Sequence, residues 1–313
     1  MGFVLEPEEA QRLLDKESRN RDVLFPYLNG EDLNRRSDQS PSRWVINFHD
    51  WPLEKAMEYP DCYEIVERLV KPEREANKYS KTAREKWWLY ERSRPELYAT
   101  IAGLDRALVI PETTKYCAFS FCPTGIVFSH MTKLLALGDG ASAAIVMSSI
   151  HEAWARTYSS TLETRLKYIT TDGFETFPFP TSVDGLESIG ERYHSHRRDI
   201  MAARREGLTT TYNRFHSPHE VSHDIATLRA LHVEMDYAVA AAYDWTGLDL
   251  GHGFHQTKQG IRYTISEAAR REVLDRLLAL NHERYAQEQA AMETASKPKS
   301  KARKRAPEQQ GLF

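Results

Sequence analysis

The hydrophobic pattern of this 313-residue chain changes at Pro180. Before that residue, short apolar or alternating runs such as "RWVINF" at 43–48 are separated by turn residues, which predicts β-strands. The segment 24–43, rich in Asn, Gly, Ser, Asp and Pro, is predicted to be a loop, and "CPTG" at 122–125 predicts a hairpin between two strands. After Pro180, three long segments repeat their apolar residues with helical spacing, namely 183–205, 221–243 and 266–289. We therefore predict an α+β domain over 21–180 that is followed by an α-helical module over 181–292.

The two ends of the chain have their own character. Residues 1–20 are predicted to form an N-terminal helix and linker, and residues 293–313 a disordered basic tail, because "KPKSKARKR" has no apolar periodicity. The last residues, "QQGLF", fit the Q-x-x-L-F pattern by which short tails bind the bacterial sliding clamp. The residues that fit it are Gln309, Leu312 and Phe313. A chance match is the alternative for so short a pattern.

Composition limits the classes of protein that fit. The 42 basic and 45 acidic residues nearly balance, so an argument for a nucleic-acid partner has to come from local clusters. The cysteines, Cys62, Cys117 and Cys122, are too few for a disulfide framework and predict reduced, buried thiols. The N-terminus turns acidic within a few residues, and the apolar run at 136–147 is too short to span a bilayer. We expect a soluble, cytoplasmic protein without a membrane partner.

A row of basic residues recurs at spacings of three and four in the segment 71–84, which predicts one basic face on a helix. Its members are Lys71, Arg74, Lys78, Lys81 and Arg84. The aromatic residues nearby are Tyr79, Trp87, Trp88 and Tyr90. Basic and aromatic side chains together are typical of binding to a phosphate backbone. A solvated face balanced by Glu73, Glu75 and Glu85 explains the same pattern equally well.

A second cluster of charge lies in "TLETRLKYITTDGFETFPFP" at 161–180. Residues two apart share a face of an extended chain, so we expect Glu163, Arg165 and Lys167 to project together. Arginine can donate to O6 and N7 of guanine, and glutamate can accept from N4 of cytosine, so one G·C pair could occupy Glu163 and Arg165. The alternative is an ion-pair ladder on a solvated strand, and the charges alone favour it.

Motifs for catalysis or metal binding are absent from the sequence. It contains no Gly-rich phosphate loop, no nucleophile elbow and no zinc-ligand spacing. The stretch "HSPHEVSH" brings His216, His219 and His223 together, but histidines in a proline-containing connector are more often solvated. We therefore predict no metal site and no catalytic residue in the chain. A self-contained metal-dependent enzyme is the alternative that the histidines would support.

Several segments resemble, in the same order, the C-terminal half of MmeI-like enzymes. These are type IIL/IIG restriction–modification proteins and related phage-defence N6-adenine DNA methyltransferases. The segments are "LFPYLNGEDLN", "SPSRWVINFHDWPLEKAMEYPDCYEIV", "VKPEREANK", "WWLYERSRPELYATIAGLDRALV", "SSIHEAWARTYSSTLETRLKYITTDGFETFPFP" and "LHVEMDYAVAAAYDW". The ordered series is specific, and the resemblance extends from about Phe3 to about Tyr285.

In that family the matching region is a target recognition domain with trailing helices, and it chooses the DNA sequence to be modified. The resemblance implies double-stranded DNA as a partner and places base reading in the stretch that ends in "FETFPFP". It favours Glu163 and Arg165 as base contacts, with Lys115, Ser149 and Arg156 as further candidates. We assign phosphate contacts to Lys71, Arg74, Lys78, Lys81, Arg84 and Lys167.

Members of the family also carry an S-adenosylmethionine-dependent methyltransferase core, and some carry an endonuclease part. This sequence has neither the Gly-rich cofactor loop nor the N/D-P-P-Y/F motif of such a core, and it has no P-D…E-x-K nuclease site. We therefore expect no cofactor in this chain, and S-adenosylmethionine in a methyltransferase core or subunit that acts as its partner. The alternative is an inactive remnant of a split or truncated methyltransferase gene.

Overall fold

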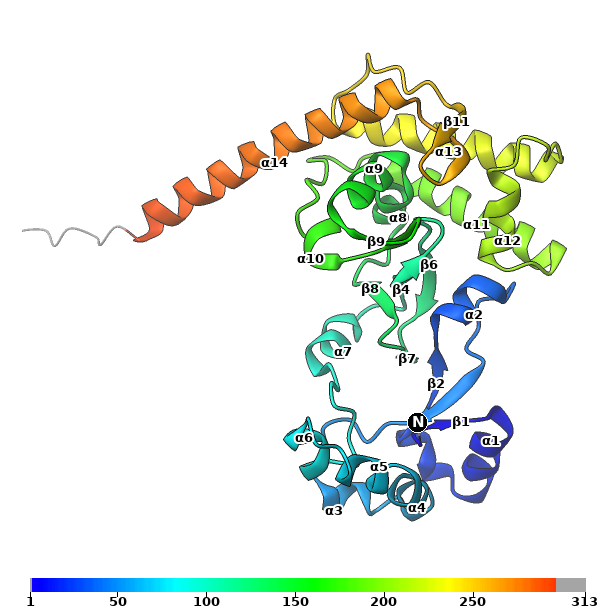
Figure 1. The fold of residues 1–313 in the computed structure, drawn as a ribbon, viewed down its shortest axis with the longest axis vertical. Helices are drawn as coiled ribbons and strands as arrows, with labels where there is room; N and C mark the ends of the chain where they lie inside the picture. Colours follow the sequence, from blue (N-terminus) through cyan, green and yellow to red (C-terminus); the bar gives the residue numbers. More distant parts are fainter. Residues whose placement is uncertain (1, 297–313) are drawn as a thin grey trace, which may run out of the picture.

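The computed structural model describes residues 2–296, which form a smaller and a larger lobe joined by β-structure (Figure 1). The smaller lobe contains a four-stranded sheet in the order β1-β3-β2-β7. Its strands are β1 (Val4–Leu5), β2 (Leu24–Leu28), β3 (Arg43–Ile46) and β7 (Val127–Phe128). β3 is antiparallel to β1 and β2, whereas β7 joins β2 in parallel from a distant part of the chain.

Short helices surround this sheet. They are α1 (Pro7–Lys16), the 3-10 helix η1 (Ser18–Asp22), α3 (Leu53–Ala56), α4 (Pro60–Leu69), α5 (Lys71–Glu75) and α6 (Lys81–Glu85). Their apolar sides cover the sheet, so that Val45 and Ile46 of β3 share a core with Val66 of α4 and with Trp87 and Trp88. The lobe therefore has a hydrophobic core of its own.

A second sheet, with the order β6-β4-β8, links the two lobes (Figure 1). Its antiparallel strands are β4 (Arg106–Pro111), β6 (Ser120–Pro123) and β8 (Thr132–Leu135), and it is accompanied by α2 (Gly30–Arg35) and α7 (Pro95–Ile101). Leu28 of β2, Val109 of β4 and Phe128 of β7 belong to one small core. Apolar contact between the two sheets thus joins the lobes.

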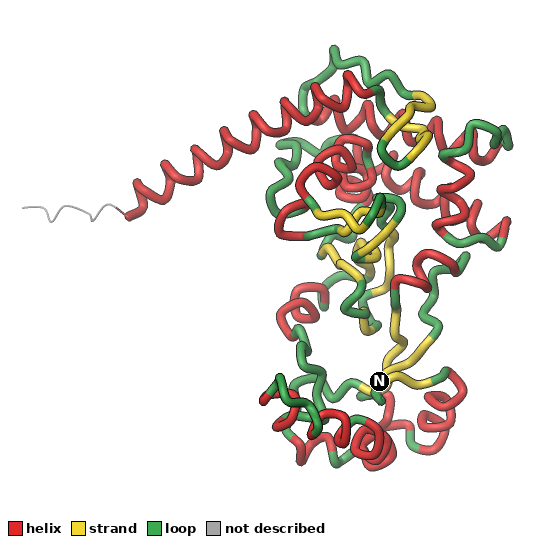
Figure 2. The backbone as a smooth tube through the Cα atoms, in the orientation of Figure 1, coloured by secondary structure: helices red, strands yellow, loops and turns green. Residues whose placement is uncertain are grey.

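The larger lobe begins with a three-stranded sheet and becomes helical, as Figure 2 shows. The sheet contains β5 (Thr113–Thr114), β9 (Ser160–Leu162) and β10 (Arg165–Lys167). The helices are α8 (Gly140–Met147), α9 (Ser149–Tyr158), α10 (Thr170–Gly173), α11 (Leu186–Arg204), α12 (Leu208–Phe215), α13 (His223–Ala242) and α14 (Glu267–Ser296). A hairpin of β11 (Gly253–Thr257) and β12 (Gly260–Thr264) precedes α14. A mixed α/β region followed by a helical part confirms the predicted fold class.

One hydrophobic core continues across residue 180. Trp154 of α9 and Phe177 belong to the same buried cluster as Val273 and Leu277 of α14. Helices α8 and α11 also pack closely, because a Cβ atom on Gly190 would lie 1.8 Å from the carbonyl oxygen of Gly140. The two sides of the predicted domain boundary therefore pack as one body, and the boundary itself stays a prediction.

The sequence-based expectations fail in two local places. The segment 24–43 was expected to be a loop, but it contains β2 and α2, the latter capped by reciprocal hydrogen bonds between Asn29 and Asp32. The expected hairpin at "CPTG" is also wrong, because β6 pairs with β4 whereas β7 pairs with β2. Both errors involve strand partners that are distant in sequence, which local patterns do not specify.

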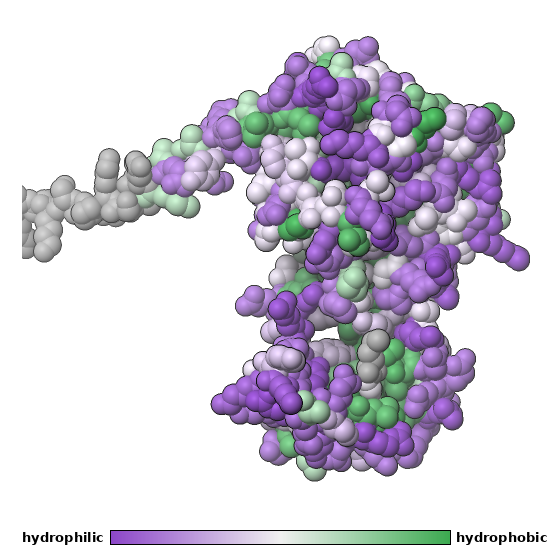
Figure 3. Space-filling view, viewed as in Figure 1, coloured by the Kyte–Doolittle hydropathy of each residue, from purple (hydrophilic) through white to green (hydrophobic). Residues whose placement is uncertain are grey.

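The surface and the cysteines agree with the composition. The face shown in Figure 3 is mainly hydrophilic. Within residues 2–296, no helix is long and apolar enough to cross a membrane. Cys62, Cys117 and Cys122 are all buried and unpaired, as expected.

Candidate nucleic-acid interface

A cleft of about 740 Å³ in the larger lobe is lined by two β-hairpins, by α9 and by the first turns of α14. Charged residues come from each of these elements: Arg156 from α9, Glu163 from the β9–β10 hairpin, Lys258 and Arg262 from the β11–β12 hairpin, and Arg270 from α14. Of the five predicted base contacts, Ser149, Arg156 and Glu163 line this cleft. The fold therefore brings residues from both sides of position 180 to one site.

The β9–β10 hairpin carries the charge cluster that the sequence singled out. Arg165 pairs with Leu162, which leaves Glu163 and Thr164 as a two-residue turn, and Glu163 has a φ of 58°. Leu166 is fully buried, so its neighbours Arg165 and Lys167 face away from the core. The predicted extended structure is correct for β10, but Glu163 lies in the turn and not on the strand.

Glu163 and Arg165 contact each other at the tip of this hairpin. Nη2 of Arg165 donates to Oε2 of Glu163 at 3.0 Å, and the two side chains remain 47% and 75% exposed, respectively. An exposed ion pair of this kind contributes only about 0–1 kcal/mol to stability. The pair can therefore open, and it then offers one acceptor and several donors to a ligand.

Arg156 and Lys115 lie next to one another. Nε of Arg156 donates to Oε1 of Glu152 at 2.6 Å, and its Nη2 donates to the carbonyl oxygen of Lys115 at 3.2 Å. Nη1 of Arg156 is buried and makes no hydrogen bond within the described residues. Lys115 donates to Asn213 at 2.7 Å, and burial, followed by the nearby Arg262, lowers the pKa of Lys115. The structure thus brings these two predicted base contacts together.

Ser149 has a different position from the one that its predicted role requires. It is the first residue of α9 and only 2% exposed, and its hydroxyl lies 3.1 Å from Nε2 of His232. Its backbone N–H donates to Oδ1 of Asp236 at 2.7 Å, and Oδ2 of Asp236 lies 2.8 Å from Nε2 of His252. The hydroxyl is engaged inside the protein and Ser149 has a structural role at the start of α9, and a base contact by Ser149 stays a prediction.

The basic row at 71–84 does not form one helical face. α5 ends at Glu75 and α6 begins at Lys81, and a turn separates them. Oδ1 of Asn77 accepts from two backbone N–H groups of this turn, and the hydroxyl of Ser80 caps α6. Such side-chain bonds compete with the helix and end it. The assumption of a continuous basic helix is therefore wrong.

Several members of the basic row already have partners in the smaller lobe. Lys71 donates to Glu67 at 2.9 Å, and Arg84 donates to the carbonyl oxygen of Asn77 at 2.6 Å. Lys81 lies 3.6 Å from Glu85. Trp87 and Trp88, which were expected beside the basic face, are buried in the core. A phosphate-binding role for this row stays a prediction.

Residues 1–181, more than half of the chain, match the family model described as "MmeI, target recognition domain". The chain belongs to this family. No curated protein sequence matches the chain.

Among the solved structures, 17 chains match this chain. One of them is the type IIL restriction–modification enzyme MmeI in complex with DNA. The match has a TM-score of 0.60 and 18% identity, and it covers 91% of this chain but 34% of the MmeI chain. The likeness shows a shared fold, and this chain spans about a third of the length of that enzyme chain.

The match to the target recognition domain family ends at residue 181, whereas the cleft includes residues beyond it. Lys258 and Arg262 of the β11–β12 hairpin were not among the predicted site residues. The signal that could have revealed this hairpin is "TKQG", in which Gly260 has a φ of 92°. The polar strands around that turn do not alternate clearly enough to predict a buried face.

The three histidines of "HSPHEVSH" do not come together. His216 is half-buried, and its Nδ1 accepts from the backbone N–H of Tyr263 at 3.2 Å, whereas His219 and His223 are exposed. Burial, followed by the charge of Arg262, lowers the pKa of His216 well below its ordinary value. In the part of the chain that the structure describes, no group of three or more His, Cys, Asp or Glu residues could hold a metal ion.

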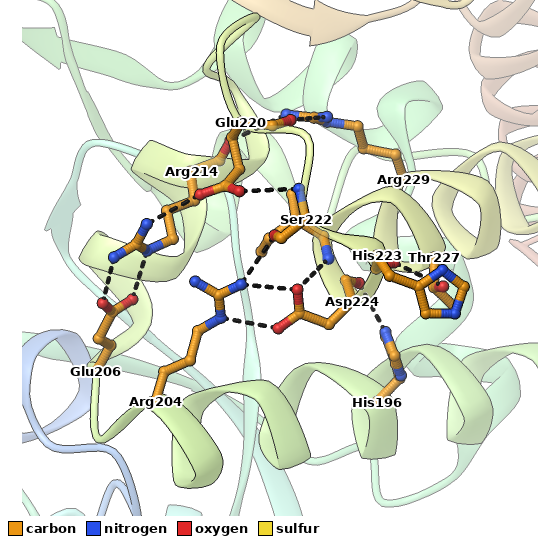
Figure 4. Close-up of polar contacts among 11 residues, drawn as sticks. His196, Arg204, Glu206, Arg214, Glu220, Ser222, His223, Asp224, Thr227 and Arg229 are labelled. Atoms are coloured by element: carbon orange, nitrogen blue, oxygen red, sulfur yellow. Dashed lines mark hydrogen bonds and ion pairs between the residues drawn. The ribbon is translucent and has the colours of Figure 1, made fainter.

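An acid–base cluster holds the loop that contains these histidines (Figure 4). Arg204 of α11 donates to both carboxylate oxygens of Asp224, at 2.7 and 2.8 Å. Arg214 of α12 donates to Glu206 at 2.6 Å and to Glu220 at 2.9 Å. The cluster links the ends of α11, α12 and α13, and thereby fixes the loop. The predicted clamp-binding residues Gln309, Leu312 and Phe313 lie outside the described residues.

Proposed function

We propose that this chain is a sequence-reading module that binds double-stranded DNA for a DNA-modifying system. The observation that carries the proposal is the cleft, in which a charged hairpin tip and several arginine and lysine side chains meet on a target recognition fold. The fold shared with MmeI, a protein solved in complex with DNA, supports the same conclusion.

Glu163 and Arg165 are the proposed readers of one G·C pair. The Arg165 guanidinium has the fork of N–H donors that matches O6 and N7 of guanine, and the Glu163 carboxylate can accept from N4 of cytosine. The 3.0 Å contact between them supports this assignment, since both groups reach the same place. Arg156 and Lys115 are proposed to contact neighbouring bases, and the position of Arg156 in the lining of the cleft supports this.

Phosphate contacts hold the module on the duplex. Lys167 shares the solvent-facing side of β10 with Arg165, and its Nζ lies 3.7 Å from Oε1 of Glu112. The lysines and arginines of the smaller lobe, Lys71, Arg74, Lys78, Lys81 and Arg84, are proposed to extend the contact along the backbone. Such contacts position a protein without reading sequence.

The chemistry is proposed to belong to a methyltransferase core that binds S-adenosylmethionine and modifies adenine. Such a core would belong to another polypeptide or to another part of a longer protein, and the system would serve restriction–modification or phage defence in the cytoplasm. The C-terminal "QQGLF" is further proposed to bind a sliding clamp, and deletion of Leu312 and Phe313 should then abolish capture of the chain on immobilised clamp.

The test is to measure DNA binding by the full chain, alone and together with a methyltransferase core, against a library of duplexes. Replacing Arg165 with alanine should relax one base-pair position and reduce the preference there by about 1–3 kcal/mol. Lys167→Ala is the matched control on the same strand face, and it should weaken binding to all sequences alike.

Two results would count against the proposal. If Arg165→Ala leaves the preferred sequence unchanged, Arg165 is not a base reader. If the chain binds no duplex in either form, it is not a recognition module, and an inactive remnant becomes the better interpretation.

A further inference from the structure

The β11–β12 hairpin is anchored firmly to the larger lobe while its tip lies at the cleft. At its base, the backbone N–H of Tyr263 donates to His216, and the Arg229 guanidinium lies 5.0 Å from the ring of Phe254 and 5.5 Å from that of Tyr263. Lys258 and Gln259 form the two-residue tip, and both line the cleft. The hairpin is therefore anchored at its base by His216, which also lines the cleft, and by Arg229 of α13.

The balance of charge inside the cleft is uneven. Each acidic residue that lines it already has a basic partner: Glu152 contacts Arg156, Glu163 contacts Arg165, and Glu267 contacts Arg270 and Arg271. Lys258 and Arg262 also line the cleft, but within residues 2–296 neither has an acidic partner. Nη1 of Arg262 donates only to the carbonyl oxygen of its neighbour Ile261.

A third cation lies close to Arg262. The guanidinium of Arg262 lies 5.3 Å from the ring centroid of Tyr116, and Nζ of Lys115 lies 5.2 Å from the same ring. Burial, and after it the charge of Arg262, lowers the pKa of Lys115. Like charges this close raise the energy of the free protein, so a bound anion would be stabilised here.

We propose that the β11–β12 hairpin is a phosphodiester-binding arm, in which Lys258 and Arg262 hold the DNA backbone in the same cleft where the β9–β10 hairpin reads bases. This inference rests on the proposed function, and it assigns a ligand class to a segment outside the matched family region. The two hairpins then have separate tasks. A phosphate binds hydrogen-bond donors and is repelled by carboxylates, and the β11–β12 arm offers donors alone. The tip of the β9–β10 hairpin offers both a donor and a carboxylate acceptor.

The experiment compares Lys258→Ala, Arg262→Gln and the double variant with the full-length chain, alone and with a methyltransferase core. Binding is measured at several salt concentrations on the preferred duplex and on a scrambled one. Each substitution should weaken both duplexes by the same factor. Each should also lower the slope of log affinity against log salt by about one, and the double variant by about two.

Arg198→Gln is the control, because Arg198 is 63% exposed on α11 and does not line the cleft. It should change neither affinity nor salt slope. Thermal unfolding of each variant shows whether the hairpin remains folded, and Lys258 is suited to this because its side chain is exposed.

An unchanged salt slope in a folded double variant would overturn the phosphate-binding arm. A loss confined to one base-pair position would overturn it as well, since the hairpin would then read bases. If the unmodified chain binds DNA without sequence preference but with a hairpin-dependent slope, the arm stands and the base-reading function fails. If it binds no duplex at all, both fail.

Discussion

The two hairpins that line the cleft have similar geometry and different chemistry. Each has a two-residue tip, and each contains one residue with positive φ, which is Glu163 in β9–β10 and Gly260 in β11–β12. Glycine adopts such a conformation without strain, whereas glutamate does so at a cost of about 1 kcal/mol. The β9–β10 hairpin therefore carries backbone strain at Glu163, the residue that places a carboxylate at its tip.

The difference also appears in the charges. The β9–β10 tip combines an acceptor with a donor, Glu163 with Arg165, whereas the β11–β12 hairpin presents Lys258 and Arg262 without acidic partners among the described residues. Discrimination between bases requires donors and acceptors in fixed positions, and phosphate binding requires positive charge alone. The comparison therefore predicts that damage to one hairpin changes selectivity and damage to the other changes affinity.

The largest effect is expected from Asp236→Asn, because Asp236 connects the supports of both hairpins. It accepts from the N–H of Ser149 at the start of α9, which leads into β9, and it contacts His252 just before β11. Burial alone would raise the pKa of Asp236, but His232, His252 and the hydrogen bond from Ser149 lower it, so the group is a buried, partnered carboxylate. Breaking such a network costs roughly 3–5 kcal/mol.

The measurement is chemical denaturation of the folded chain at neutral pH. Asp275→Asn, at an exposed position on α14, is the control and should stay within about 0.5 kcal/mol of the unmodified chain. Amide exchange should accelerate in both hairpins of the Asp236 variant. A loss below about 1 kcal/mol would show that the two hairpins do not depend on a common support.

The sequence predicted one of the two hairpins that line the cleft and missed the other. The charged segment around Arg165 was found from local alternation, and the resemblance to a known family gave it a role. The β11–β12 hairpin was missed because each strand carries only one or two large apolar residues, too few for a clear alternation, and only the turn at Gly260 marks it. The cleft itself joins residues near 150–164 with residues near 256–274, and no local pattern specifies that proximity.

For the basic row at 71–84, the local pattern predicted a structure that the chain does not form. A spacing of three and four predicted one helical face from Lys71 to Arg84, but Asn77 and Ser80 offered the backbone competing hydrogen bonds and ended the helix. Periodicity in charge identifies a face only where the intervening residues allow the helix to continue. By contrast, the long apolar repeats after residue 180 were confirmed as α11, α13 and α14.

A smaller effect, which should separate the two hairpins, is expected from Glu220→Gln. Hydrogen bonds from Ser222 and Arg214 lower the pKa of Glu220 to about 2 from its ordinary 4.5, and Arg204 lowers that of Asp224. A carboxylate whose pKa is lowered by folding stabilises the protein above about pH 4.5, and this contribution disappears as the pH falls toward 2. The unmodified chain should therefore lose stability over that range.

The Glu220 variant should be less stable by about 1–2 kcal/mol at neutral pH, because solvent partly screens the ion pairs of the cluster. Its stability should also depend less on pH below 4.5 than that of the unmodified chain. Denaturation at a series of pH values measures both. Because the cluster fixes the loop that carries His216, amide exchange should accelerate in β11–β12 and not in β9–β10. Glu54→Gln, at an exposed position in α3, should leave all three readouts unchanged. Equal acceleration in both hairpins would contradict their separate support.

The smallest effect on stability is expected from Glu163→Gly, paired with Gly260→Ala as its counterpart. Removal of Glu163 relieves about 1 kcal/mol of backbone strain but loses an exposed ion pair and gives the unfolded chain more freedom, so the net change should lie within about 0.5 kcal/mol. Gly260→Ala should instead destabilise by about 1–2 kcal/mol through backbone strain alone, since nothing lies within 4 Å of the added Cβ atom.

Binding measured on the same two variants then separates function from stability. Glu163→Gly should keep its fold and its salt slope but lose preference at one base pair, because Arg165 no longer has a carboxylate beside it. Gly260→Ala should keep its base preference and lower affinity for every duplex, because the strained turn displaces Lys258. If Glu163→Gly binds with the same base-pair preference as the unmodified chain, Glu163 makes no base contact. The two hairpins would then differ in backbone geometry and not in their contacts with DNA.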